Sequence, residues 1–157
     1  MPLIRFCFLL ATLALAAAAT PAGAAAGAHC SIATTPLAFG HYVPSRHAPT
    51  DFTATLTLTC TATGAEPAAV DGTISLLGSA GGRRLSDGTN QLRYQTFSDP
   101  ARTLAWTDGA GAKTVSGLVA PGTPLRASFT IYGRLLARQP QAQVGHYTDR
   151  ITAILNY

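Results

Sequence analysis

The sequence predicts an all-β protein built as a sandwich of two sheets. About seven short runs alternate apolar and polar residues with a period of two, which is typical of half-buried strands. Turn signals rich in Gly, Pro and Asp separate these runs about every 8–12 residues. No segment has the apolar period of 3.6 residues that marks a helix. Many short strands with regular turns favour a β-sandwich.

The first half of the chain holds the most regular strand. In residues 52–60 the odd positions are threonines and the even positions are apolar or, at Cys60, a cysteine. Threonine tolerates the solvated side of a pleated strand, so the even positions are expected to face the core. Before this strand, Leu37 and Phe39 alternate with Ala38, and a bend and a loop follow from Gly40.

The later strands are shorter and are separated by loops. Residues 61–71 and 78–84 are predicted loops, and the glycines of the second lack the GK[ST] ending of a phosphate-binding loop. The predicted short strands are residues 73–77, 92–97, 104–106 and 114–119.

Residues 127–157 hold two further strand patterns around a polar loop. In the first pattern Ala127, Phe129 and Ile131 share one face. The shared face of the second holds Ile151, Ala153, Leu155 and Tyr157. The pattern still runs at Tyr157, which leaves open where the next strand of the sheet comes from.

Residues 1–26 have the pattern of a secretory signal peptide, which leaves residues 27–157 as one mature domain. Arg5 supplies the positive start, residues 6–19 are almost entirely apolar, and small residues follow. The apolar run is short for a membrane span, so an uncleaved anchor is the alternative interpretation. After removal of the signal no transmembrane segment is expected.

The cysteines of the mature chain indicate one disulfide bond. Cys7 lies in the signal, so Cys30 and Cys60 remain as an even pair in an exported chain. Two unpaired buried thiols are the alternative. Lipoprotein processing at Cys30 is not expected, because His29 occupies a position that needs a small residue.

Charge and motifs argue against several classes of function. Loss of Arg5 with the signal leaves ten basic and seven acidic residues, and the arginines are scattered, so no nucleic-acid partner is expected. The four histidines lack metal-ligand spacing, no GxSxG motif exists, and the aspartates mostly sit beside Gly or Pro, as in turns. We therefore expect no enzyme, no metal and no cofactor. A sugar-binding platform at Trp106 and Tyr132 is the weaker alternative to a core role.

Several short motifs resemble those of the spore coat protein U domain, which is shared with subunits of archaic, Csu-type chaperone–usher pili. They are LAFGHY (37–42), LTLTC (56–60), LRY (92–94) with FSD (97–99), IYGR (131–134) and GHYTD (145–149), together with Cys30, Trp106 and Gln139. The resemblance spans residues 30–157. Any single motif would be weak evidence, whereas the combination is fairly specific.

The resemblance implies an incomplete immunoglobulin-like sandwich that lacks its final strand. In that family a periplasmic chaperone first fills the gap, and the N-terminal strand of a sister pilus subunit then replaces it at an outer-membrane usher. The chain would pass through the periplasm to a fibre on the cell surface. The Tyr157 carboxylate would be the anchor for the chaperone. Strand parity gives the predicted groove set: Phe52, Leu56, Leu58, Phe129, Ile131, Ile151, Ala153 and Leu155.

One departure from the family pattern concerns the donor strand. A polymerising pilin carries alternating large apolar residues before its first cysteine, whereas residues 21–29 read PAGAAAGAH. Alanine methyls fill apolar pockets poorly, so this chain is expected to accept a strand without donating one. Such a subunit would sit at the tip of a pilus. The alternatives are a shaft subunit that tolerates a poor donor and a stand-alone secreted coat or matrix protein.

Overall fold

The computed structural model describes residues 27–78 and 82–157. The predicted signal peptide, residues 1–26, lies outside the described residues and stays a prediction. Residues 79–81, in the middle of the predicted glycine-rich turn, also lie outside them.

Every regular element in the described ranges is a β-strand, so the predicted all-β class is confirmed. The strands are β1 (Ala28–Thr34), β2 (Thr50–Ala62), β3 (Ala68–Leu76), β4 (Arg83–Ser86), β5 (Gln91–Phe97), β6 (Lys113–Val119), β7 (Leu125–Leu135) and β8 (Ala153–Asn156). Within those ranges, the search for a helix with the length and hydropathy of a bilayer span gives none.

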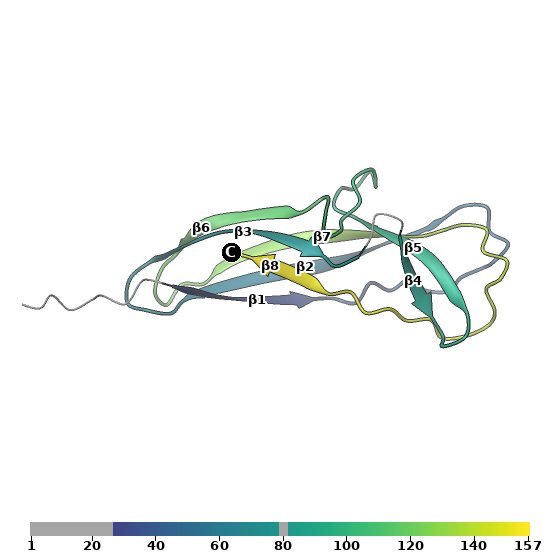
Figure 1. The fold of residues 1–157 in the computed structure, drawn as a ribbon, viewed down its shortest axis with the longest axis horizontal. Helices are drawn as coiled ribbons and strands as arrows, with labels where there is room; N and C mark the ends of the chain where they lie inside the picture. The colour runs from purple at the N-terminus through teal and green to yellow at the C-terminus, as the bar shows by residue number, and fades with distance from the viewer. Residues whose placement is uncertain (1–26, 79–81) are drawn as a thin grey trace, which may run out of the picture.

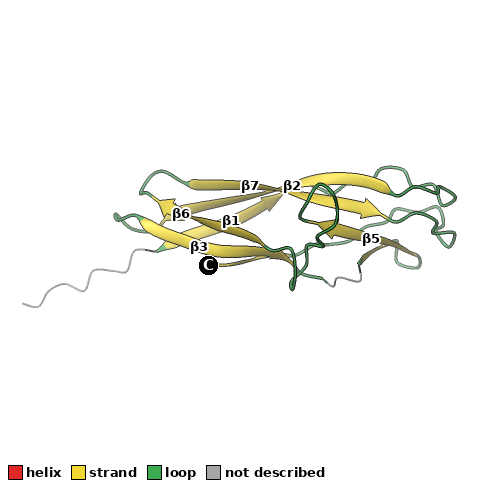
Figure 2. Ribbon diagram, turned by 90° about the horizontal axis from the view of Figure 1, so that it is seen from above, coloured by secondary structure: helices red, strands yellow, loops and turns green. Residues whose placement is uncertain are grey.

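The strands form two sheets that face each other, consistent with an immunoglobulin-like sandwich (Figures 1 and 2). One sheet has five strands in the order β1-β2-β7-β5-β4, and the other has three in the order β6-β3-β8. All paired strands are antiparallel. The long β2–β7 pair joins the two most regular strand patterns of the sequence, from Thr50 opposite Leu135 to Cys60 opposite Leu125.

The core lies between the sheets and follows the parity that the sequence predicts for β2. Leu56 and Leu58 are fully buried, whereas Thr53 and Thr55 are exposed on the outer face. Trp106 is also buried and donates its indole N–H to the carbonyl of Ile74 at 3.1 Å, so its core role is confirmed. An indole in the core needs such a partner, because an unpaired buried donor is costly.

Several predicted elements differ from the structure. The predicted loop 78–84 is wrong at its end, because β4 begins at Arg83, and the strand pattern in residues 151–157 forms a strand only over Ala153–Asn156. The predicted loop 61–71 is wrong at its end, because β3 begins at Ala68, and its first four residues alternate between buried and exposed. Residues 104–106 form no strand and contribute only a bridge between Ala105 and Phe97. Leu37 and Phe39 lie in an irregular segment after β1, yet both pack against the core.

Candidate functional site

The two sheets meet at two strands that each lack a second neighbour. β1 ends the five-stranded sheet and β8 ends the three-stranded sheet. Figure 1 shows β8 running beside β1, and a hydrogen bond from the Cys30 N–H to the Tyr157 hydroxyl, 3.3 Å long, joins them at one end. In the described part of the chain, neither strand forms a ladder with anything on its outer edge. We call the space between these edges and its continuation the acceptor gap.

The edge of β1 presents free backbone groups to the gap. In an antiparallel ladder, alternate residues bond to the neighbouring strand and the others point away from it. Thr35, just after β1, donates its N–H to the carbonyl of Thr55 at 2.9 Å, so odd-numbered residues face β2. The N–H and C=O groups of Cys30, Ile32 and Thr34 therefore point into the gap.

The edge of β8 has the same property. Leu77 donates its N–H to the carbonyl of Thr152 at 2.8 Å, which sets even-numbered residues of β8 toward β3. The backbone groups of Ala153 and Leu155 therefore point into the gap. Both rims of the gap can hydrogen-bond to an extended chain.

A cavity of about 910 Å³ continues the gap beyond the strands. Residues 34–44, which follow β1, form one wall, and residues 142–151, which precede β8, form the other. The apolar side chains that line it include Leu37, Phe39, Tyr94, Ile131, Leu135 and Ile151. The cavity is thus a part of the core that is open to solvent, and apolar residues of both sheets line its base.

Side chains at the rims of the gap face inward but are only partly covered. Cys30 and Ile32 of β1, and Ala153 and Leu155 of β8, pack against the core cluster and keep part of their surface exposed. Residues of the same parity in central β2, such as Leu56, are fully buried. The difference indicates that the core lacks a layer at the gap.

The first wall is fixed by its own sheet. The hydroxyl of Tyr42 accepts the N–H of Gln139 at 3.0 Å and donates to the carbonyl of Leu136 at 3.4 Å. The Leu37 side chain lies over Gly133 of β7, where an added Cβ would come within 2.7 Å of it. Glycine in the IYGR motif therefore makes room for this wall.

Gln139 holds the loop after β7 against β5. Its side-chain amide donates to the carbonyl of Arg93 at 3.0 Å, and its carbonyl accepts the N–H of the same residue at 2.6 Å. The side chain thus takes the place of a strand at the end of the β5–β7 ladder. This accounts for Gln139 among the motif residues.

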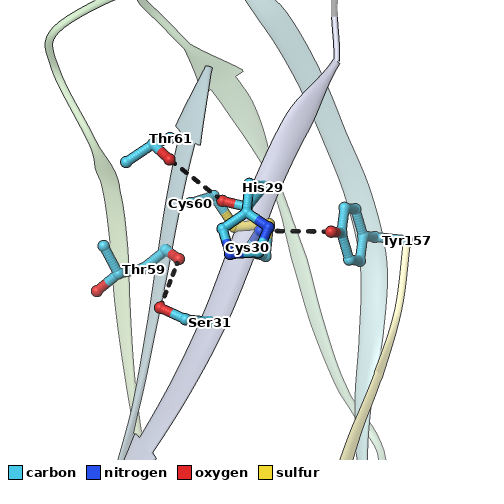
Figure 3. Close-up of a disulfide and its surroundings, with 7 residues drawn as sticks. All are labelled: His29, Cys30, Ser31, Thr59, Cys60, Thr61 and Tyr157. Atoms are coloured by element: carbon cyan, nitrogen blue, oxygen red, sulfur yellow. Dashed lines mark hydrogen bonds between the residues drawn. A yellow bond between two sulfur atoms is a disulfide. The ribbon is translucent and has the colours of Figure 1, made fainter. Parts of the chain in front are cut away.

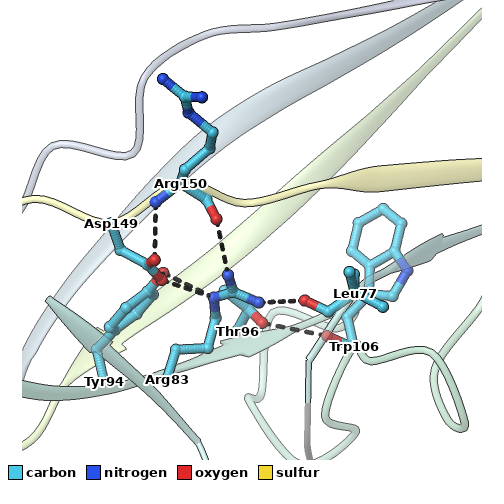
Figure 4. Close-up of polar contacts among 7 residues, drawn as sticks. All are labelled: Leu77, Arg83, Tyr94, Thr96, Trp106, Asp149 and Arg150. Atoms are coloured by element: carbon cyan, nitrogen blue, oxygen red, sulfur yellow. Dashed lines mark hydrogen bonds and ion pairs between the residues drawn. The ribbon is translucent and has the colours of Figure 1, made fainter.

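The second wall is fixed to β4. Ser86 and Thr148 exchange two backbone hydrogen bonds, of 2.8 and 2.9 Å. Asp149 then accepts a hydrogen bond from the Tyr94 hydroxyl at 2.7 Å and pairs with Arg83 Nε at 3.0 Å (Figure 4). Burial raises the pKa of Tyr94 well above its usual range, and the bond to Asp149 raises it further, so the phenol remains a donor.

Arg83 joins both sheets next to the gap. Its guanidinium donates to the carbonyl of Leu77, at the end of β3, and to the carbonyl of Arg150 at 3.1 Å (Figure 4). Its side chain is only 13% exposed. One mostly covered cation therefore ties β4, the end of β3 and the second wall together.

The predicted disulfide is confirmed and lies at the rim of the gap (Figure 3). Cys30 of β1 is directly opposite Cys60 of β2, with their Cα atoms 4.0 Å apart. This is the close spacing of an antiparallel pair that does not exchange backbone hydrogen bonds. The bond ties the edge strand to its one neighbour and leaves the other edge of β1 free.

The predicted groove set lies at several depths. Ile131, Ile151 and Ala153 line the cavity. The other members do not line it: Leu56 and Leu58 are fully buried, Phe129 and Leu155 are partly buried against the main core, and Phe52 packs edge-on against Phe39 at 5.6 Å.

Sequence parity missed the residues of the two walls. Leu37, Phe39 and Tyr147 lie in irregular segments, where a period of two does not apply. The signal that could have found them is the set of motifs, because LAFGHY (37–42) and GHYTD (145–149) coincide with the two walls.

The described residues were also compared with the pattern of a metal site. Among residues 27–78 and 82–157, no group of three or more His, Cys, Asp or Glu side chains could hold a metal ion. The strongest exposed ion pair is structural: Arg134 donates two hydrogen bonds, of 2.7 and 2.8 Å, to Asp51 on the outer face of the five-stranded sheet. These bonds lower the pKa of Asp51 below its usual range.

Comparison with known proteins gives one informative result. A family model described as the Spore Coat Protein U domain matches residues 14–154. This range contains β1 to β7 and the first half of β8. A search of curated proteins gives no match. The family has a structural, surface-exposed character and includes chaperone–usher pilus subunits.

Proposed function

We propose that this chain, which belongs to the Spore Coat Protein U domain family, is a structural subunit of a surface fibre. In this role it would accept a β-strand from another protein. The observation that carries the proposal is the acceptor gap, in which two strand edges with free backbone groups lead into an apolar cavity. The protein would be exported and would have no catalytic role.

The size of the cavity supports the proposal of an occupant. It has about six times the volume of an engineered apolar cavity of about 150 Å³ that binds benzene. Four or five large apolar side chains, each contributing about 1.5–3 kcal/mol on burial, would together contribute on the order of 10 kcal/mol. That is similar to the net stability of a whole domain, about 5–15 kcal/mol, so the free chain should be marginally stable.

The chemistry of the rims favours a strand over a small apolar ligand. Cys30, Ile32 and Thr34 on one rim, and Ala153 and Leu155 on the other, present backbone donors and acceptors at strand spacing. An extended peptide would pair with these groups and place alternate side chains in the cavity. A small apolar ligand would leave these groups unpaired, except for the Cys30 N–H, which donates to the Tyr157 hydroxyl.

The proposed partners follow from the family. A periplasmic chaperone would fill the gap first, with the Tyr157 carboxylate as its anchor, and a sister subunit would replace it at an outer-membrane usher. Export would use the predicted signal in residues 1–26. Because residues 21–29 offer only alanine methyls to a partner's pockets, we place the chain at the tip, as an acceptor that does not donate.

The proposal is tested by the thermal melt of the mature chain with a synthetic peptide. The probe has about fifteen residues, in which valine alternates with threonine between terminal lysines, and matches the length from β1 to residue 44. At about 100 times its Kd, binding should raise the unfolding free energy by about 2.7 kcal/mol, or the Tm by about 10 °C. A high Tm that the peptide does not change would refute strand acceptance and favour the stand-alone coat protein.

Two controls make the test specific. A peptide with serine in place of valine keeps the backbone donors and should give no shift. The Ala153→Phe variant places a large side chain at the cavity, so it should raise the Tm of the free chain and reduce the peptide-dependent rise. Ala69→Phe, on the exposed outer face of β3, should change neither quantity.

The tip position is tested by assembly with sister subunits. We expect the chain to receive a partner's N-terminal peptide and to fill no partner's gap. Recovery of the chain in the middle of fibres would overturn the tip position without affecting strand acceptance.

A further inference from the structure

We infer that the side chain of Tyr157 is a latch across the acceptor gap, which an incoming strand must displace. This inference rests on the proposed function and adds a control step to the same site. The latch is the hydrogen bond that the Tyr157 hydroxyl accepts from the Cys30 N–H, 3.3 Å long (Figure 3).

The latch uses a backbone group that a strand would need. The Cys30 N–H points away from β2 and toward the gap, as the Cys30–Cys60 pairing requires. A strand paired with β1 over its whole length would present a carbonyl oxygen to this N–H. The Tyr157 hydroxyl occupies that oxygen's place, so the latch and a strand pairing at Cys30 exclude each other.

No other hydrogen bond crosses the gap in the described chain. Residues 28–35 bond to β2, residues 148–150 bond to β4, and β8 bonds to β3, whereas residues 28–41 and residues 142–156 share no hydrogen bond with each other. At the end of the first wall, the Tyr42 hydroxyl accepts the N–H of Gln139, which joins this wall to the loop after β7. Between that end and Tyr157 the gap is open, so the latch is the one polar contact that an entering strand has to break.

The backbone and the side chain of Tyr157 are held very differently. A Cβ built on Gly72 of β3 would lie 2.8 Å from the Tyr157 Cβ and 3.1 Å from its Cα, so the backbone there is tightly packed. The residue as a whole is nevertheless 57% exposed. The ring can therefore swing away from β1 while the end of β8 stays in place, which is the behaviour a latch needs.

The effect of the latch on strand binding can be estimated from one hydrogen bond at a partly solvated site. A net bond of ordinary strength corresponds to about a two- to tenfold preference for the closed state. If only the open state takes a strand, the apparent Kd is weakened by the same factor. Because opening precedes binding, the factor should appear in the association rate and leave the dissociation rate unchanged.

The test compares the mature chain with its Tyr157→Phe variant, which keeps the ring and removes the hydroxyl. Association of the fluorescently labelled valine–threonine peptide is followed by stopped flow, and amide exchange at Cys30 by NMR without peptide. We expect the variant to bind two- to tenfold faster at an unchanged dissociation rate, and its Cys30 amide to exchange faster. Tyr132→Phe is the matched control, because the Tyr132 hydroxyl lies on the outer face of β7, away from the gap.

The outcomes separate the latch from the proposed function. Equal association rates in the wild type and Tyr157→Phe, with binding by both, would overturn the latch alone. A change in the dissociation rate only would also overturn it, because the hydroxyl would then act on the bound state. Absence of peptide binding by both proteins would overturn strand acceptance and the latch with it.

Discussion

Removal of the Cys30–Cys60 disulfide should destabilise the protein strongly, because this bond holds an edge strand. The bond joins residues 30 positions apart. In the chain-entropy model a loop of this length contributes about 3.6 kcal/mol at 25 °C. For a domain of about 130 residues, with an unfolding entropy near 2.1 cal/mol/K per residue, this corresponds to a fall in Tm of about 13 °C.

The double variant Cys30→Ala/Cys60→Ala measures this contribution. Urea unfolding, followed by circular dichroism, should give an unfolding free energy about 3–4 kcal/mol below that of the oxidised wild type. Reductant should lower the wild-type value by a similar amount and leave the variant unchanged. A loss below about 1 kcal/mol would refute the reasoning, because it would mean that the unfolded chain without the bond already keeps residues 30 and 60 close together.

Three further predictions concern the residues that hold the walls and the outer face. Gly133→Ala should cost about 1–2 kcal/mol in urea unfolding, because the new Cβ meets Leu37, whereas Gly64→Ala, with nothing within 4 Å, should be nearly neutral. Arg83→Met should cost about 2 kcal/mol by the same measurement, because it leaves buried polar groups without their cation. Asp51→Asn should cost at most about 1 kcal/mol, since the pair with Arg134 is about one-third exposed. Because the pKa of Asp51 is lower in the folded state than in the unfolded state, its ionised carboxylate stabilises the fold at pH values above the unfolded pKa near 4. Wild type and variant should therefore converge in stability as the pH falls below about 4.

The sequence predicts the fold where residues alternate and misses it where they do not. The period of two in residues 52–60 and 127–132 locates β2 and β7, which pair to form the middle of the larger sheet. The start of β3 is missed because Asp71 and Gly72 interrupt its pattern and resemble turn residues. Asp71 lies on the exposed outer face, and Gly72 gives room to the chain at Tyr157.

The sequence predicts part of the residues that line the cavity and misses the others. Parity identifies Ile131 and Ala153, which lie in regular strands and line the cavity. It cannot distinguish them from Leu58, which has the same parity and lies under a complete layer. Which inward-facing residue is uncovered depends on the missing neighbour of β1 and β8, and that is a property of the sheet topology. Local periodicity contains no information on topology.

The arrangement of polar contacts explains why the gap need not collapse in the free chain. Closing it would bring the second wall toward the first and would break the Arg83 contacts to Asp149 and Arg150, together with the paired backbone bonds between Ser86 and Thr148. The Arg83 side chain and the Asp149 carboxylate are partly buried, so loss of their partners would cost about 1–3 kcal/mol each. The apolar surface gained by collapse would have to exceed several such losses at once. A strand that entered as proposed would gain the same apolar burial and would pair the free backbone groups of both rims. Among the described residues, it would have to break the Tyr157 contact alone. Under the proposed function, filling by a strand is therefore favoured over collapse, because both walls are fastened to the five-stranded sheet and not to each other.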